Sequence, residues 1–425
     1  MSDPDSVPAP APPPSWAGRM LRLFMWVYIL VMAGDMGLWR PLTRFGVDYD
    51  KHWQAARAVL EGNNCYLGGN LWVGFNYPQA SAYAFCWLGL FSVETAEKVW
   101  KMTLLALLIG AGWIIMRRCR PPAPLAAQQA QGAFAARLAT WRHWRLVSAF
   151  TLSAYLPATS GLYQGNIDPL NAVLAVAMLG GVLAGAPLAA GVCWTLLVLV
   201  KMVPLALIVP VVLWRQWRIL YGFGLTLTAY FVLLLVTGRL GYEWFFVREV
   251  IPPVPVWWRT ISVSPLGFFM KAAGQWANYN DPYVFLRVNH IFLAIMGPLY
   301  VGLLLWLRRR GVGWLRGLEA AMIFYPILSP LLEYHHYVWI LPALILQIRR
   351  WVMGELPSRR AFAFLAGWGL LYAGYTNNVQ NLMVYFGDWV HFGSVPGYMS
   401  LFLLSLWDVL WPSQSSSFSS SSSNI

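Results

Sequence analysis

Charged residues are scarce in this sequence: they make up only 11% of its 425 residues, against about 25% in soluble globular domains. Cysteine is also rare, and no pair among Cys65, Cys86, Cys119 and Cys193 has the spacing of metal ligands. The sequence contains no Walker loop, GxGxxG motif, HExxH motif or repeat of fixed period. These absences argue against a soluble fold and against nucleotide-driven and hydrolytic enzymes.

Hydrophobic residues are abundant instead, at 58% of the sequence, and the mean hydropathy is +0.53. A soluble fold of this size could not bury so much apolar surface, so lipid must solvate part of it. The 25 tryptophans are typical of rings at the headgroup level of a bilayer. The formal charge of +13 forms no basic face of the kind that binds nucleic acid, and it fits basic residues retained on the inner side. We therefore expect an integral, multi-pass membrane protein with no nucleic-acid partner.

The apolar runs predict an all-α, polytopic fold with about twelve transmembrane helices and both termini inside. Six arginines between positions 117 and 145 mark the loop after the second span as cytoplasmic. A single span is expected from about Leu146 to Gly161, and two short segments, Gly191–Val200 and Val203–Trp214, are expected to meet at a hinge. Long outer loops precede about Trp100 and follow Gly238, and the amphipathic patch Ser81–Phe91 predicts an outer juxtamembrane helix.

Three regions are expected along the chain. Residues 1–18 are acidic and rich in proline, without the basic start of a signal peptide, and predict a disordered cytoplasmic tail. Residues 19–412 form the transmembrane domain, and residues 413–425 form a polar tail rich in serine.

Ionisable residues at the membrane boundary are costly and often functional, and they form four groups here. The first group follows the first span and contains Asp48, Asp50 and His52. If the chain is helical from Tyr49, then His52 and Ala56 share a face with Asp48. Asp48 is then either a general base near the membrane surface or a solvated loop carboxylate.

The second group is the turn Tyr163–Pro169 between two spans, with Gln164, Asn166 and Asp168. Its amides at the membrane edge either hydrogen-bond sugar hydroxyls or belong to a simple interhelical turn in which Pro169 starts the next helix.

The third group is Lys201 with Pro204, in the middle of an apolar run. Such a lysine needs an anion or a break in the helix, and its compact ammonium suits a phosphate oxygen unless it merely snorkels to the interface. The fourth group contains Glu333, His335 and His336. Adjacent histidines on a helix point about 100° apart, which favours contact of one imidazole with phosphate or sugar, or a plain interfacial pair, over metal binding. All four groups fall on the outer side, which predicts one outward-facing site.

The order of these groups resembles family 87 of the GT-C superfamily of membrane glycosyltransferases, the polyprenyl-phosphate-mannose-dependent α-mannosyltransferases. The resemblance covers residues 45 to 345. It is carried by Asp48-Tyr49, Ala55-Ala56, Gly62 to Tyr66, Tyr77-Pro78-Gln79, Gly165-Asn166 with Pro169-Leu170, Gly191 with Lys201 to Pro204, and Ser329-Pro330 with His335-His336. The sequence departs from the family at Gln79, where a second proline is usual, and at Ser262–Pro265 and Lys271, where an Asn-Gln-Ser-like step and an arginine are usual.

The resemblance implies a GT-C-like fold and an inverting transfer of a sugar, mannose first among the hexoses, from a polyprenyl-phosphate donor to a hydroxyl of a glycolipid or glycan on the outer side. It implies Asp48 as the catalytic base, and no cofactor. Residues implied to bind the donor phosphate are Lys201, His335 or His336, Arg259 and Lys271. Residues implied to bind the sugar or acceptor are Asp50, His52, Tyr77, Gln164, Asn166, Asp168 and Glu333. No convincing set of metal ligands is present; Asp48, Asp50 and His52 come nearest to one.

Other functions stay open at this point. A lipid or sugar transporter or flippase would use Lys201 as an intramembrane site, although it would be favoured by inverted repeats, which are not found. An aminoarabinose transferase of the same superfamily is compatible with the pattern, and the sugar and the acceptor are not determined by it. The abundance of tryptophan and arginine suits a bacterial inner membrane, with the site facing the periplasm.

Overall fold

The computed structural model describes residues 16–43, 46, 49–67, 75–122, 141–153, 155–251, 266, 282–329, 332, 334–373 and 395–411. Within these ranges the chain is helical and contains no strand. The first half comprises α1 (Trp16–Met32), η1 (Ala33–Trp39), α2 (Arg40–Thr43), α3 (Tyr49–Leu60), α4 (Gln79–Ala84), η2 (Cys86–Leu90), α5 (Val93–Arg118), α8 (Trp141–Ser153), α9 (Leu156–Gln164), α10 (Asp168–Leu183) and α11 (Pro187–Val200). The second half comprises η3 (Val203–Leu207), α12 (Ile208–Leu213), α13 (Trp217–Val236), α14 (Leu240–Phe245), η4 (Phe246–Val250), α18 (Pro282–Arg309), α19 (Trp314–Phe324), η6 (Tyr325–Leu328), η7 (Tyr334–Ile340), α20 (Leu341–Val352), α21 (Ser358–Ala373) and α23 (Val395–Leu410).

Three of the described helices are long and apolar enough to cross a bilayer: Val93–Arg118, Trp217–Val236 and Leu286–Arg309. Shorter apolar segments of 10–17 residues accompany them, namely Asp168–Leu183, Pro187–Val200, Val203–Leu213 and Val395–Leu410. The described part of the chain is therefore all-helical, as predicted, and contains helices long and apolar enough to span a membrane.

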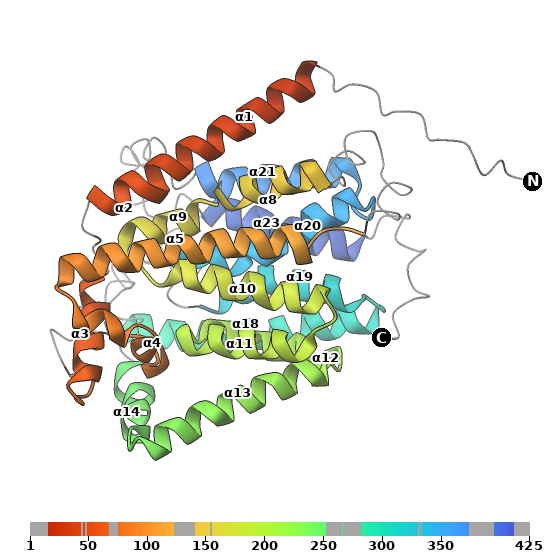
Figure 1. Ribbon diagram of the computed structural model, residues 1–425. Coiled ribbons are helices and arrows are strands. Elements are labelled where there is room, and N and C mark those ends of the chain that lie inside the picture. The colour runs from red at the N-terminus through yellow and green to blue at the C-terminus, as the bar shows by residue number, and fades with distance from the viewer. Residues whose placement is uncertain are drawn as a thin grey trace, which may run out of the picture.

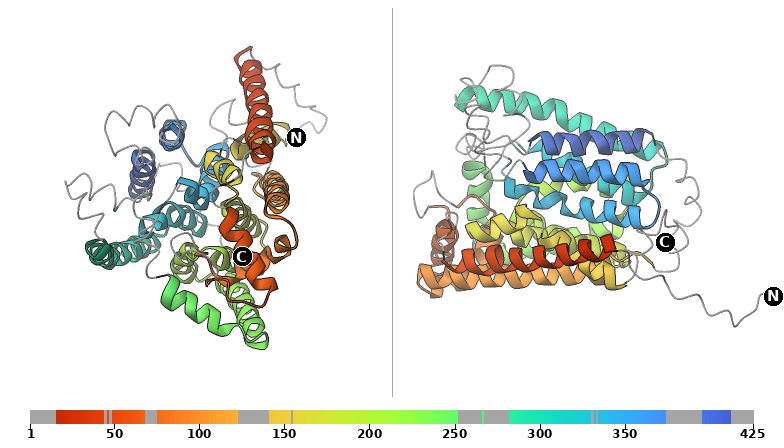
Figure 2. Two further views of the ribbon diagram at one scale, coloured as in Figure 1. Left: turned by 90° about the vertical axis from the view of Figure 1, so that its left-hand side faces the viewer. Right: turned by 90° about the horizontal axis from the view of Figure 1, so that it is seen from above.

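The long helices run side by side in one bundle, with the short helices α3, α4 and α14 gathered at one end (Figure 1). Figure 2 shows the same bundle from that end and from above, with its long helices close to parallel. In the interior α10 packs between α5 and α11, and α11 packs against α13. The end with α3, α4 and α14 is called the outer end below, because the basic residues predict that it faces outward, and the opposite end is called the inner end.

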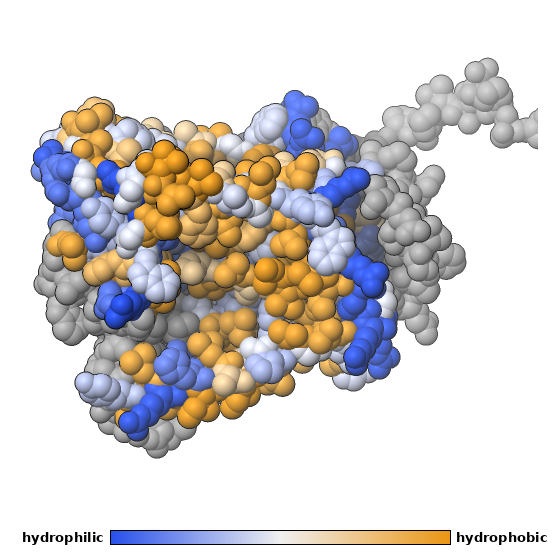
Figure 3. Space-filling model, turned by 90° about the horizontal axis from the view of Figure 1, so that it is seen from below, coloured by the Kyte–Doolittle hydropathy of each residue, from blue (hydrophilic) through white to orange (hydrophobic). Residues whose placement is uncertain are grey.

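Large apolar side chains cover the flanks of the bundle. Leu225 on α13, Ile291 on α18 and Leu403 on α23 are each more than half exposed. On the face drawn in Figure 3, hydrophobic residues occupy the middle and hydrophilic residues gather toward the ends. A surface of this kind is stable when lipid covers it.

Local breakers explain where the structure differs from the predicted segments. The span predicted from Leu146 to Gly161 is divided between α8 and α9, because Pro157 stands in the first turn of α9 and cannot continue a preceding helix. The patch Ser81–Phe91 is not one helix but α4 and the 3₁₀ turn η2, separated at Phe85. α5 begins at Val93, earlier than the predicted Val99, because the Ser92 side chain accepts the Thr95 N–H and caps it.

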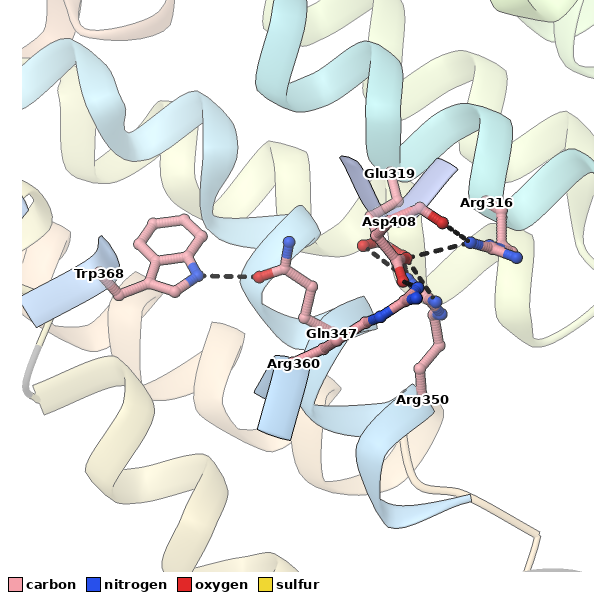
Figure 4. A network of polar contacts seen from close by, with 7 residues as sticks. All are labelled: Arg316, Glu319, Gln347, Arg350, Arg360, Trp368 and Asp408. Carbon is pink, nitrogen blue, oxygen red and sulfur yellow. Dashed lines mark hydrogen bonds and ion pairs between the residues drawn. The ribbon is translucent and has the colours of Figure 1, made fainter. Parts of the chain in front are cut away.

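A buried charge network joins four helices at the inner end (Figure 4). Arg350 of α20 donates to both oxygens of Glu319 at 3.0 Å and to Asp408 of α23 at 2.8 Å. Arg316 and Arg360 also donate to the Asp408 carboxylate, at 3.0 and 2.9 Å. These residues lie at the start of α19 and α21 and at the end of α20 and α23, so the network fixes how the four helices meet.

Candidate active site

The predicted hinge is present, and it carries Lys201 at the outer end. α11 ends at Val200, Lys201 has extended backbone angles, and η3 starts at Val203 with Pro204 in its first turn. A proline removes a backbone N–H and disfavours helix at the residue before it, so the apolar run cannot continue as one helix. The Trp194 indole donates to the Pro204 carbonyl oxygen at 2.9 Å and holds the break in place.

The Lys201 ammonium is paired with Asp168. Nζ lies 3.1 Å from Oδ2 and 3.2 Å from Oδ1 of Asp168. The carboxylate is fully buried, while the Lys201 side chain is 13% exposed. A buried carboxylate and a buried ammonium each cost several kcal/mol on their own, so the pair is stable only because the two are in contact. The structure thus places Asp168 as the counter-ion of Lys201.

The α9–α10 turn positions that carboxylate. Gly165 ends α9 with φ of 69°, a left-handed conformation that glycine adopts without strain. Asn166 accepts the Asp168 N–H through Oδ1 at 3.2 Å, and Asn171 donates to Asp168 Oδ1 at 2.8 Å. Asp168 stands in the first turn of α10, where the helix dipole also favours a negative charge.

Aromatic rings surround the Lys201 ammonium. Nζ lies 5.5 Å from the centre of the Tyr77 ring and 5.6 Å from that of Trp339, within cation–π range. Basic side chains also lie against the Tyr77 ring: the Lys51 ammonium is 5.5 Å from it and the His52 ring is 5.1 Å from it. His336 stacks on Trp339 with 5.1 Å between ring centres. Four segments distant in sequence therefore place cations and titratable imidazoles around one point.

The chain around the start of α3 is fixed to the same turn. Gly46 donates its N–H to Glu97, and a Cβ on Gly46 would lie 2.3 Å from the Gln164 carbonyl oxygen. A Cβ on Gly165 would lie 2.9 Å from Cβ of Tyr49. Both glycines are needed because the two backbones approach too closely for a side chain.

A second buried ion pair lies beneath this contact. The Lys101 ammonium is 2.7 Å from Glu97, and its side chain is fully buried. Trp100, beside it on α5, donates to the Gly165 carbonyl oxygen at 3.2 Å. α5 thereby supports both the α9–α10 turn and the chain entering α3.

Buried polar atoms of these elements without a hydrogen-bond partner among the described residues include the Tyr49 hydroxyl and the Trp339 indole nitrogen. Buried polar groups in folded proteins nearly always form a hydrogen bond to protein, ligand or water, so these atoms are available to a ligand or to water. Together with the cations, they make a site that can hold an anion and a hydroxylated group.

Comparison with known proteins identifies the family. Residues 75–330, more than half of the chain, match the model of glycosyltransferase family 87. The chain belongs to glycosyltransferase family 87. This membership confirms the resemblance seen in the motifs and makes the protein a membrane glycosyltransferase rather than a transporter.

Two further comparisons add nothing to this assignment. No curated protein matches the chain. The crystal structure of ArnT from Cupriavidus metallidurans in the apo state is similar at 15% sequence identity and a TM-score of 0.39, covering 92% of this chain and 78% of that chain.

The structure of this family 87 glycosyltransferase brings together several side chains named from the sequence: His52, Tyr77, Asn166, Asp168, Lys201 and His336. Gln164 is half-buried beside them, and its Oε1 has no hydrogen-bond partner among the described residues. Asp50 points away: it is exposed and accepts a hydrogen bond from Gln54 at 2.7 Å. Asp48, Arg259, Lys271, Glu333 and the side chain of His335 lie outside the described residues.

Sequence reasoning missed four residues of this region: Lys51, Glu97, Lys101 and Trp339. Glu97 and Lys101 had a readable signal, since they stand four apart and continue the buried stripe of α5 that includes Leu104 and Leu108. Lys51 also had a signal in the sequence, because it precedes His52 on the same short helix. Trp339 had none, because its position against Lys201 depends on tertiary packing.

No group of three or more histidine, cysteine, aspartate or glutamate side chains that could hold a metal ion is found in the described ranges. The neighbours of Lys201 are cations, one carboxylate and rings, which is a donor set for an anion rather than for a metal.

Proposed function

We propose that this glycosyltransferase transfers mannose from a polyprenyl-phosphate donor to a hydroxyl of a glycolipid or glycan, with inversion, at the outer surface of a bacterial inner membrane. The donor and the orientation come from the motif pattern of the family. The geometry at the outer end of the bundle supports the kind of chemistry that such a donor requires.

One observation carries the proposal: a lysine ammonium, anchored by a buried aspartate, is held between two aromatic rings at the break of an apolar helix. A dolichol-type or polyprenyl donor joins an apolar chain to a phosphate. Its chain needs lipid or apolar helices, and its phosphate needs a fixed cation where the apolar surface ends. Lys201 meets both conditions, because α11 and α12 on either side of it are apolar.

The reaction breaks the bond between the anomeric carbon and the phosphate oxygen and forms a bond from that carbon to the acceptor oxygen. The acceptor hydroxyl loses its proton to a base, which we assign to Asp48, and the lipid phosphate leaves with the bonding electron pair. Negative charge grows on the leaving oxygen, so a cation placed beforehand lowers the barrier. Lys201 and one of His335 and His336 supply positive charge there, with Arg259 and Lys271 as further candidates from the second outer loop.

Attack from the face opposite the phosphate inverts the anomeric configuration. The sugar then has to lie between the base and the cations. The rate depends on how close the acceptor oxygen is to the anomeric carbon and on how well the two are aligned. His52, Tyr77, Gln164 and Asn166 are the candidates for contact with the sugar or the acceptor. Asp50 is a candidate only for an acceptor that approaches from the exposed side of α3.

The test is sugar transfer in nanodiscs from radiolabelled polyprenyl-phosphate-mannose, with membrane extract as the acceptor pool. We expect label in a new product with wild-type protein and a loss of at least about a hundredfold with Asp48→Asn, the usual range for removing a general base. Unchanged unfolding temperature would confirm that the variant is folded. Transfer by Asp48→Asn at the wild-type rate would remove the base assignment. Absence of transfer from this donor and from its arabinose and glucose counterparts would refute the proposed donor class.

A further inference from the structure

The exposed side of α3 has features that the proposed reaction does not use. Asp50, Gln54, Arg57 and Glu61 are all exposed and follow one another at helical spacing. They form a line of hydrogen bonds: Gln54 donates to Asp50 at 2.7 Å, and Arg57 donates to Glu61 at 3.1 Å. At a rise of 1.5 Å per residue this line is about 16 Å long. It starts at Asp50, in the first turn of α3, and ends at Glu61, one residue after α3.

A hollow of about 460 Å³ lies along the far part of this line. It is lined by Trp53, Gln54, Arg57, Ala58, Glu61, Asn63, Asn64 and Leu67. Arg57 lies over the Trp53 ring at 5.7 Å, so the guanidinium and the indole ring line the hollow together. Trp53 is itself fixed, because its indole donates to the Phe91 carbonyl oxygen at 3.2 Å.

The lining indicates what kind of ligand would fit. The charges in it are one arginine and one glutamate, already paired, so the hollow offers no net charge to an anion. Its remaining polar groups are the amides of Gln54, Asn63 and Asn64, which donate and accept at once. A flat aromatic wall beside paired donors and acceptors matches a sugar ring, which has an apolar C–H face and a rim of hydroxyls. The Lys201 site, by contrast, is basic and suits a phosphate.

We propose that this hollow binds the glycan of the acceptor, two or more sugar units away from the hydroxyl that reacts. This inference rests on the proposed function and adds that the acceptor is an oligosaccharide chain rather than a single sugar. α3 would then serve both substrates: its buried side carries His52 toward the donor site, and its exposed side guides the acceptor chain toward the start of the helix.

The test uses the double variant Arg57→Ala/Asn63→Ala in full-length protein in nanodiscs. Saturation-transfer difference NMR with α-linked mannotetraose, and with maltotetraose as a second hexose chain, measures binding without any need for turnover. We expect a signal from at least one tetrasaccharide with wild type, and its loss with the double variant. Arg248→Ala is the matched control, since Arg248 is an exposed arginine at the same end, paired with Glu249 at 3.2 Å, and it does not line the hollow.

Kinetics give the second readout. With a glycolipid acceptor that carries a tetrasaccharide, we expect the acceptor KM of the double variant to rise about tenfold, which corresponds to loss of one or two hydrogen bonds. The donor KM, and the KM for an acceptor with one sugar, should match those of wild type. Equal tetrasaccharide binding by wild type and variant, or no binding by wild type, would overturn the proposal. Binding without transfer from any donor would refute the proposed function and leave the glycan site standing.

Discussion

Lys201 shows how one side chain in an apolar setting can point to chemistry. Its ammonium is neutralised by Asp168, keeps 13% of its side chain exposed and lies against two aromatic rings. Asp168 therefore holds the ammonium in place beside the two rings. A lysine that only snorkelled to the interface would not need a fully buried partner.

We predict that Lys201→Ala weakens use of the donor before use of the acceptor. The donor KM should rise and kcat should fall, together about a hundredfold in kcat/KM, because a charge-assisted contact to phosphate is worth about 1.5–3 kcal/mol. Transfer assays with varied polyprenyl-phosphate-mannose measure this. Lys98→Ala is the control, since Lys98 is an exposed lysine near the start of α5, at the same outer end of the bundle. An unchanged donor KM and kcat for Lys201→Ala would refute its role.

At this scale the sequence predicts the unusual residue but not its partner. A lysine in an apolar run, three residues before a proline, is visible by inspection. Asp168 stands 33 positions earlier, and only the packing of α10 against α11 brings the two together. The sequence motif therefore led to Asp168 as a sugar ligand, whereas the structure places its carboxylate on Lys201 and Asn171.

Helix α14 and the turn η4 act as a clamp on the segment that carries Tyr77. Glu243 of α14 accepts the Gln79 N–H at 3.2 Å and the Tyr230 hydroxyl at 3.0 Å. Phe246 stacks on Tyr66, whose hydroxyl donates to the Tyr77 carbonyl oxygen at 3.1 Å. The backbone is thus held on both sides of Tyr77, which keeps its ring against Lys201.

We predict that Glu243→Ala lowers transfer about tenfold and that Glu243→Gln largely restores it. Alanine leaves the buried Gln79 N–H and Tyr230 hydroxyl without an acceptor, at a cost of about 1–3 kcal/mol. Glutamine keeps an acceptor oxygen, and its neutrality suits the site, because burial raises the pKa of the Glu243 carboxyl above its usual range. Initial rates of the two variants measure this, with the exposed Glu249→Ala on η4 as the control.

A double-mutant cycle separates positioning from general stability. If Glu243 acts through Tyr77, Glu243→Ala should have little further effect in a Tyr77→Ala background. Effects that simply multiply would mean that the α14 clamp does not work through the Tyr77 ring.

Elements were predictable to the extent that local chemistry determines them. The hinge at residues 201–204 follows from proline and is present, and the helix considered from Tyr49 is present as α3. The division of 146–161 into α8 and α9 and of 81–91 into α4 and η2 was not predicted, because the apolar pattern continues across each break. The clamp by α14 joins residues 164 positions apart, which no local pattern reveals.

The two ends of the bundle use charge differently. At the outer end buried pairs such as Lys201–Asp168 lie beside orphan polar atoms and rings. At the inner end Arg350 and Asp408 are paired within a network over four helices (Figure 4). The first arrangement places an ion pair at a break in an apolar helix, and the second joins four helices. The excess of basic residues predicted which end is inner, but the pairing of residues 31 to 92 positions apart could not be read from it.

Because Asp408 is the acceptor shared by Arg316, Arg350 and Arg360, it is the residue on which the inner network depends. Asp408→Asn keeps the shape of the side chain and removes the charge, leaving three guanidiniums against Glu319 alone. Breaking a buried pair costs about 3–5 kcal/mol, whereas an exposed pair contributes about 0–1 kcal/mol. We predict that Asp408→Asn lowers the unfolding temperature in detergent by several degrees, while Glu249→Gln, which removes the exposed Arg248–Glu249 pair, leaves it unchanged.

The same variant distinguishes the two ends functionally. If the inner network only joins helices, folded Asp408→Asn protein at low temperature should keep the wild-type donor KM, because nothing in the Lys201 site contacts Asp408 among the described residues. A raised donor KM at full folding would mean that the packing of α19 and α20 at the inner end is transmitted along those helices to η7 and its ring at Trp339. A wild-type unfolding temperature would mean that the three arginines find other acceptors once the Asp408 carboxylate is gone.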